Sequence, residues 1–311
     1  MLLAGDRRVA ARLISMVENG DPMAGEALAL VYPHTGKAQI IGLTGSPGSG
    51  KSTLAGALTR CYRRMGRTVG IIAVDPTSPF TGGALLGDRV RMQELSGDPG
   101  VFIRSMGSRG ALGGLAVATN EAIDILDASG KDIVIVETVG AGQVEVEVMK
   151  YAHTCVVVTM PGAGDEIQAI KAGILEIADV FVVNKADREG CQRTMHDLES
   201  MVETGPSGRG GWKPPVLATV ALENEGVDEL LEMIEAHWRY LEESGALERK
   251  ALERMKAQLL EVLEQEVARG AALALEGGAG KEIVERMVSR EIGPRAGAKE
   301  LLRKMFPTAG S

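Results

Sequence analysis

A glycine-rich turn near the start of the chain limits what the sequence can fold into. Residues 45–52 read Gly-Ser-Pro-Gly-Ser-Gly-Lys-Ser, which fits the pattern GxxxxGK[ST]. An apolar run at residues 40–44 precedes the turn, and a helical stretch at residues 53–64 follows it. In this context glycines let backbone N–H groups surround phosphate oxygens, and the helix N-terminus adds a positive partial charge. The turn therefore predicts a phosphate site between a strand and a helix.

The side chains of this turn have separate chemical tasks. Lys51 can reach the β- and γ-phosphates of a nucleotide, and the Ser52 hydroxyl can bind Mg²⁺. We therefore predict that a set of consecutive residues holds the phosphates: Gly45, Pro47, Gly48, Ser49, Gly50, Lys51, Ser52 and Thr53.

Short apolar runs alternate with helical stretches as far as about residue 240. Besides residues 40–44, they lie at residues 69–74, 133–136, 155–159, 180–183 and 216–218. Continuous apolar strands between helices are typical of a parallel sheet covered on both faces. We predict an α/β fold in which residues 37–240 form a mainly parallel central sheet flanked by helices.

Helical extensions are predicted at both ends of this domain. In residues 1–36, four apolar side chains fall at helical spacing, namely Val9, Leu13, Ile14 and Val17. Residues 241–311 have the pattern of an amphipathic arm, with apolar positions that include Leu252, Met255, Leu259, Val262, Leu263 and Val267. Such a stripe packs either on its own domain or on another chain. Because the stripe is large for so short an arm, we favour another chain.

A second motif follows the strand predicted at residues 180–183. Asn184-Lys185-Ala186-Asp187 fits NKxD, the guanine-reading pattern of GTPases. A carboxylate at Asp187 can accept both the N1–H and the 2-amino group of guanine, whereas adenine offers neither. Asn184 can bond the base edge and stabilise the loop, and the Lys185 stem can lie along the ring. The motif predicts GTP and GDP as ligands rather than ATP.

Carboxylates near the phosphate turn are candidate Mg²⁺ ligands. Glu137-Thr138-Val139-Gly140 resembles the DxxG pattern with Glu in place of Asp, and the Gly140 N–H can meet the γ-phosphate. Asp75 and Asp88 lie in loops where they can bind the ion, although either could instead cap a helix or be solvated. We predict Ser52, Asp75, Asp88 and Glu137 as metal ligands, and Lys51, Glu137 and Asp88 as catalytic residues.

Composition excludes several other functions. The 311 residues include 34 Lys and Arg against 42 Asp and Glu, a net charge of −8, and no basic block that would favour nucleic acid as the main partner. There is no apolar run of about 18 residues, as a membrane span requires, and the start of the chain lacks a secretory signal pattern. Three distant cysteines, Cys61, Cys155 and Cys191, predict no disulfide framework. We expect a cytoplasmic protein.

Taken in order, these motifs resemble the MeaB/ArgK family of P-loop GTPases, which includes the human methylmalonic aciduria type A protein. The matching segments also include Asp75-Pro76-Thr77-Ser78-Pro79, Gly87-Asp88-Arg89, Arg104-Ser105-Met106, Arg109-Gly110 and Pro161-Gly162-Ala163-Gly164-Asp165. The resemblance covers almost the whole chain. It implies a GTPase chaperone that gates adenosylcobalamin loading, and the removal of damaged cofactor, for an acyl-CoA mutase. It also implies the adenosyltransferase that supplies this cofactor as a partner, and a homodimer through the C-terminal arm.

The resemblance also implies particular residue roles. It places the Mg²⁺ carboxylates on Asp75, Asp88 and Glu137, and a third switch on residues 162–171, with Gln168 and Lys171 as signalling residues. The last nucleotide-contacting loop matches Thr219, Val220 and Ala221. Ala218 stands where the family often has Lys, so one contact with guanine is lost.

Two rival functions are weaker on the same sequence. A small-molecule kinase needs an acceptor site, for which no motif is visible, and NKxD disfavours ATP. A nickel-type metal-insertion GTPase often carries clustered His and Cys ligands, whereas here the four histidines are scattered: His34, His153, His196 and His237.

Overall fold

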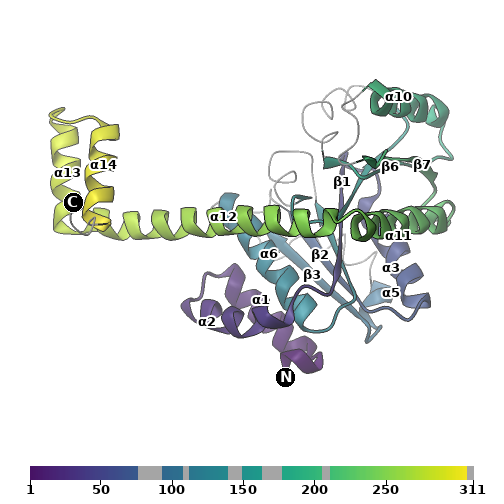
Figure 1. Ribbon diagram of the computed structural model, residues 1–311, viewed down its shortest axis with the longest axis horizontal. Helices are drawn as coiled ribbons and strands as arrows, with labels where there is room; N and C mark the ends of the chain where they lie inside the picture. The colour runs from purple at the N-terminus through teal and green to yellow at the C-terminus, as the bar shows by residue number, and fades with distance from the viewer. Residues whose placement is uncertain (76–92, 108–111, 139–148, 163–176, 205–210, 307–311) are drawn as a thin grey trace. The chain divides into compact units, whose positions relative to one another are not determined.

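The structure is a computed structural model (Figure 1), and it describes residues 1–75, 93–107, 112–138, 149–162, 177–204 and 211–306. The chain forms two compact units, Met1–Arg254 and Met255–Ser311. The first unit contains the sheet and both predicted nucleotide motifs, and the second is helical.

A seven-stranded parallel sheet forms the centre of the first unit. Its order is β3-β2-β4-β1-β5-β6-β7. The strands are β1 (Gln39–Gly45), β2 (Val69–Asp75), β3 (Val101–Gly107), β4 (Ile133–Thr138), β5 (Thr154–Thr159), β6 (Val180–Asn184) and β7 (Val216–Thr219). Because all neighbouring strands are parallel, their carboxyl ends meet at one edge of the sheet, where α/β proteins bind ligands. The predicted α/β fold is confirmed.

The apolar runs predict six of these strands but miss β3. This strand lies at an edge of the sheet, and residues 103–105 in its middle are only half-buried. Arg104 and Ser105 interrupt the apolar pattern there, so the sequence lacks the continuous run that marks the central strands.

Helices cover both faces of the sheet (Figure 1). One face carries α1 (Arg7–Glu18), α2 (Pro22–Val31), α6 (Leu112–Ala128) and α10 (Cys191–Thr204). The other carries α3 (Lys51–Arg64), α5 (Gln93–Ser96) and α11 (Val227–Glu243). Successive side chains alternate between the two cores, since Ile40 packs on the first face and Ile41 on the second. Burial on both faces is why the central strands are continuously apolar.

The N-terminal helices belong to the core of the first unit. Asp6 caps α1 by accepting from the N–H groups of Arg8 (2.9 Å) and Val9 (3.3 Å). Leu13, Ile14 and Val17 are buried, as their spacing predicts. On the same helix, Glu18 pairs with Arg104 of β3, which also donates to Ser15 Oγ (3.0 Å). Arg104 therefore joins α1 to the sheet.

We expect Glu18→Gln to destabilise the protein by about 3 kcal/mol, because it leaves the Arg104 guanidinium largely buried without its counter-charge. The side chains of Glu18 and Arg104 are only 5% and 22% exposed. Chemical denaturation measures the change, with Glu26→Gln on the exposed surface of α2 as the control. A loss no larger than that of the control would show that the pair contributes little.

The C-terminal residues form three helices. They are α12 (Ala246–Glu276), which begins in the first unit and ends in the second, α13 (Gly278–Val288) and α14 (Pro294–Met305). Within the second unit, α14 packs closely on α13: a Cβ at Gly297 would lie 2.8 Å from Met287 Sδ and 3.1 Å from Ile283. Helix α12 has no fully buried residue, and it exposes Leu252, Leu259, Leu260, Leu263 and Leu273.

Candidate functional site

The predicted phosphate turn lies at the carboxyl edge of the sheet, between the end of β1 and the start of α3. Glycine is required there for two steric reasons. Gly45 has φ 129°, and a Cβ would lie 2.0 Å from the carbonyl oxygen of Val158 on β5. Gly50 has φ 94°, and a Cβ would lie 2.4 Å from Asn184 Nδ2. The turn can therefore press against β5 and the NKxD loop only because these positions lack side chains.

Lys51 folds back into the turn. Its Nζ donates to the carbonyl oxygens of Gly45 (2.7 Å) and Ser46 (3.0 Å), and only 6% of the residue is exposed. The sequence does not indicate a role for Val158, whose carbonyl oxygen accepts from the Ser46 N–H (3.2 Å). Backbone contacts of this kind leave no side-chain signal. The Lys51 ammonium therefore lies in the turn, at the site where the GxxxxGK[ST] pattern predicts phosphate binding.

Two of the predicted metal-site residues are in direct contact. Ser52 Oγ donates to Glu137 Oε1 at 2.5 Å. Glu137 reaches this position because β4 pairs with β1 in the register Leu43↔Glu137. Asp75 is the last residue of the next strand, β2, and is 5% exposed. The fold thus gathers a hydroxyl and a carboxylate beside the phosphate turn, with a second carboxylate one strand away at the same edge.

The NKxD loop is joined to the phosphate turn by two side chains. The Asn184 amide donates to Ser49 O (2.7 Å), and its Oδ1 accepts from Thr219 Oγ1 (3.0 Å) and the Ala221 N–H (3.1 Å). Lys185 donates to Gly48 O (2.6 Å) from a left-handed backbone conformation, φ 59°. Such a conformation is strained for a non-glycine residue and is found mainly where the surrounding structure requires it. Asp187 is exposed, so its carboxylate can accept hydrogen bonds from a base.

Asn184 thus connects the phosphate turn, β6 and the loop at Thr219–Ala221. We expect Asn184→Ala to lower stability by about 2–5 kcal/mol, because Ser49 O and the Ala221 N–H would lose their buried partner. Nucleotide affinity should fall together with stability, because the phosphate turn and the loop at Thr219–Ala221 would lose the bonds that fix their positions. Thermal unfolding and nucleotide titration measure the two effects, with Gln192→Ala on the exposed side of α10 as the control. An unchanged affinity would show that the loops hold their positions without Asn184.

Several predicted residues lie outside the described part of the chain. They are Asp88, Gly140, Gln168 and Lys171. Among the residues that are described, no three or more His, Cys, Asp or Glu side chains come together in a way that could hold a metal ion. A cation at Ser52 and Glu137 would therefore need further oxygen ligands, from phosphate, water or residues outside the described ranges.

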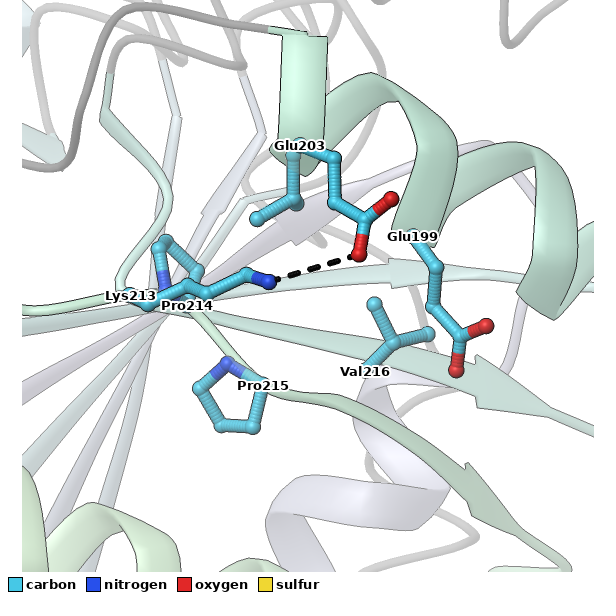
Figure 2. A pocket seen from close by; sticks show the side chains of 7 residues that line it. Glu199, Glu203, Lys213, Pro214, Pro215 and Val216 are labelled. Carbon is cyan, nitrogen blue, oxygen red and sulfur yellow. Dashed lines mark ion pairs between the residues drawn. The ribbon is translucent and has the colours of Figure 1, made fainter.

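A cavity of about 300 Å³ lies away from these motifs (Figure 2). It is lined by Glu199, Val202, Glu203, Lys213, Pro214, Pro215 and Val216. Figure 2 shows Lys213 reaching toward Glu203, at 3.6 Å. Because Val216 begins β7, the cavity lies at the amino edge of the sheet, whereas the phosphate turn lies at the carboxyl edge. It is not part of the nucleotide site.

A phosphate turn between a strand and a helix, a carboxylate on the adjacent strand, and an NKxD loop bonded to the turn define a P-loop nucleotide-binding protein of the GTPase class. None of the helices in the described ranges is long and apolar enough to cross a lipid bilayer.

Comparison with known proteins agrees with this class. A family model described as "Methylmalonyl Co-A mutase-associated GTPase MeaB" matches residues 10–275. A putative GTPase of Pyrococcus abyssi is 50% identical over 304 residues, which cover 97% of this chain and 94% of that protein. The GTPase ArgK of Escherichia coli is 36% identical over 273 residues, covering 86% and 82%. The crystal structure of a LAO/AO transport system kinase has a TM-score of 0.73 at 28% identity, covering 98% of this chain and 95% of that one.

The chain belongs to the MeaB family of P-loop GTPases. This confirms the family that the motifs resemble, the predicted GTPase activity, and the choice of guanine nucleotide as the ligand.

Proposed function

We propose that this GTPase is a chaperone of a B12-dependent acyl-CoA mutase. It would gate the loading of adenosylcobalamin into the mutase and the protection or reactivation of that enzyme. The partner would be methylmalonyl-CoA mutase or a close relative, and the adenosyltransferase that supplies the cofactor would be a second partner in the cytoplasm. The observation that carries this proposal is the match to a mutase-associated family over residues 10–275, which include the whole nucleotide site.

Hydrolysis of GTP depends on positioning and charge neutralisation more than on covalent chemistry by the protein. Lys51 would turn from the carbonyl oxygens of Gly45 and Ser46 to the β- and γ-phosphates. Backbone N–H groups of the turn and the N-terminus of α3 would share the phosphate charge. Asp187 would select guanine, and the bonds of Asn184 and Lys185 to the turn would hold the base and phosphate subsites in fixed relation.

The residues present fit Mg²⁺. A serine hydroxyl and carboxylates are the hard oxygen ligands that this ion prefers, and it usually keeps several waters and phosphate oxygens. We assign Ser52 and Glu137, with Asp75 and Asp88, to this role. A bound Mg²⁺ would supply charge neutralisation at the β- and γ-phosphates. Glu137, held by Ser52, would orient the attacking water, and Gly140 would donate its N–H to the γ-phosphate. With no strong base assigned, intrinsic hydrolysis should be slow, and contact with the mutase should accelerate it.

Contact with the mutase would depend on nucleotide state. Ordering of a segment around the γ-phosphate is a common way to convert hydrolysis into altered protein contacts. We assign this relay to the segment at residues 162–171, with Gln168 and Lys171 as the signalling residues. This segment follows β5, whose neighbour β1 leads into the phosphate turn.

The exposed leucines of α12 support a homodimer through the C-terminal residues. A helix of 31 residues without a fully buried residue presents apolar surface that a second copy could cover. Sedimentation of the full chain over a range of concentrations tests this, and a monomer at every concentration would contradict it.

The decisive experiment is GTP hydrolysis by the purified chain with and without an adenosylcobalamin-dependent mutase from the same organism. Acceleration by the mutase, absent with an unrelated enzyme, supports the chaperone function. No acceleration by any related mutase would reject it and leave only the GTPase. Phosphate transferred to a metabolite instead of water would favour the small-molecule kinase. A nickel-insertion function has little support, because the three cysteines are buried on three separate elements: α3, β5 and α10.

A further inference from the structure

A cluster of aromatic side chains lies at the amino ends of β5 and β6, at the opposite edge of the sheet from the nucleotide site. Aromatic residues make up only 3% of the chain, so their concentration here is unusual. The Trp212 ring lies 4.8 Å from His237 and 5.4 Å from Tyr240, measured between centroids. Trp238 meets His153 edge-on at 5.1 Å. His237, Trp238 and Tyr240 belong to α11, so the cluster packs this helix against the ends of the strands.

Asp179, the residue before β6, is the polar centre of this cluster. Its N–H donates to Cys155 O, and its Oδ2 accepts from the Cys155 N–H, both at 2.8 Å. Its carbonyl oxygen accepts from Trp212 Nε1 (2.8 Å), and its Oδ1 lies 3.3 Å from His237 Nε2. One residue therefore fixes the start of β6 against both β5 and α11.

Lys250, in the second turn of α12, balances the charge of Asp179. Its Nζ lies 3.3 Å from Asp179 Oδ2 and donates to His153 O at 2.7 Å. His237 is neutral at physiological pH, because burial lowers its pKa to about 4. Lys250 is thus the cation that neutralises a carboxylate whose side chain is only 15% exposed. One turn later, Arg254 pairs with Asp124 of α6 at 3.2 Å, so the first turns of α12 are bound to the core at two places.

The other end of β6 carries the base-reading loop. This strand has five residues, all buried, and pairs with β5 from Val156↔Val180 to Thr159↔Val183. Its last residue, Asn184, donates to Ser49 O in the phosphate turn. Because β6 is short, buried and paired with both β5 and β7, we treat it as a rigid element of the kind that carries coupling between sites. A shift at Asp179 would therefore reach Asn184 instead of being absorbed on the way.

We propose that Asp179 and Lys250 are positioning residues for guanine-nucleotide binding, which hold β6 by its amino end so that Asn184–Asp187 meet the phosphate turn correctly. This role depends on the nucleotide site alone and not on the mutase. Because coupling between two sites is reciprocal, bound nucleotide strengthens the attachment of the first turns of α12.

Nucleotide affinity of Lys250→Met in the full chain tests the proposal. The substitution removes the charge and keeps most of the apolar stem. We expect GDP and GTP affinity to fall about threefold to thirtyfold, with kcat at saturating GTP unchanged, since coupling through packed elements is commonly of that size. Lys256→Met, an exposed position on the same helix, is the matched control. An affinity within about twofold of the control would overturn the proposal whatever the change in Tm, and would leave the cluster a purely structural role.

Amide hydrogen exchange of the unmodified chain provides a test that does not depend on a variant folding. Addition of GDP should slow exchange in residues 246–254, the anchored turns of α12. Exchange there that is the same with and without saturating GDP would overturn the proposal. Neither measurement contains a mutase, so failure here is distinct from failure of the chaperone function.

Discussion

Lys51→Ala should lower kcat for GTP hydrolysis by about 10²–10³, the usual cost of removing one fixed group that stabilises transition-state charge. The ammonium of Lys51 is buried and held within the turn by two carbonyl oxygens, from which it would turn to the phosphates when they bind. Neutral side chains cannot replace it, because the charge that develops on the transferred phosphoryl group is spread over its oxygens. Phosphate release at saturating GTP measures the effect.

The control for Lys51→Ala is Lys37→Ala, an exposed lysine shortly before β1. Both variants should remain folded, because Lys37 is exposed and water can bond to the Gly45 and Ser46 carbonyl oxygens in place of Lys51. Hydrolysis within about tenfold of the unmodified chain would show that Lys51 is not a main source of charge stabilisation, and would reject its assigned role.

The central sheet could be predicted from sequence because burial on both faces leaves a continuous apolar run in each inner strand. The same rule fails for β3, where Arg104 is needed to bind Glu18 of α1. The sequence predicts a helix in the N-terminal extension, but nothing local in the sequence shows that its Glu18 meets a strand residue 86 positions away. Long-range ion pairs of this kind depend on the completed fold.

In the candidate nucleotide site, too, the sequence predicts what is encoded locally and misses what depends on the completed fold. The phosphate turn and NKxD have local patterns because each uses consecutive residues on one loop. Asp179 has no such pattern: it precedes β6 as an ordinary carboxylate, and its role arises from Cys155, His237 and Lys250, which come together only when β5, α11 and α12 pack. Val158 contributes through its backbone, which any residue would supply.

Asp187→Asn is expected to change the base specificity of the nucleotide site from guanine to xanthine. In its assigned role, the Asp187 carboxylate would accept two hydrogen bonds from guanine, at N1–H and at the 2-amino group. An asparagine amide can accept only one and presents N–H to the other. Loss of a charged acceptor facing two donors should weaken GDP binding by about 10²–10⁴-fold. Xanthine has a carbonyl oxygen at position 2, which accepts from the asparagine N–H, so XDP should bind the variant better than GDP.

Competition between GDP and XDP for the variant and for the unmodified chain measures this exchange directly. Because Asp187 is exposed, the substitution should leave Tm unchanged, which separates loss of recognition from loss of folding. Asp197→Asn, an exposed carboxylate on α10, is the matched control and should keep the guanine preference. Asn184 and Lys185 remain bonded to the phosphate turn in the variant, so phosphate contacts persist while base selection changes. A variant that still prefers GDP would mean that guanine is selected by another group, and Asp187 would lose its assigned role.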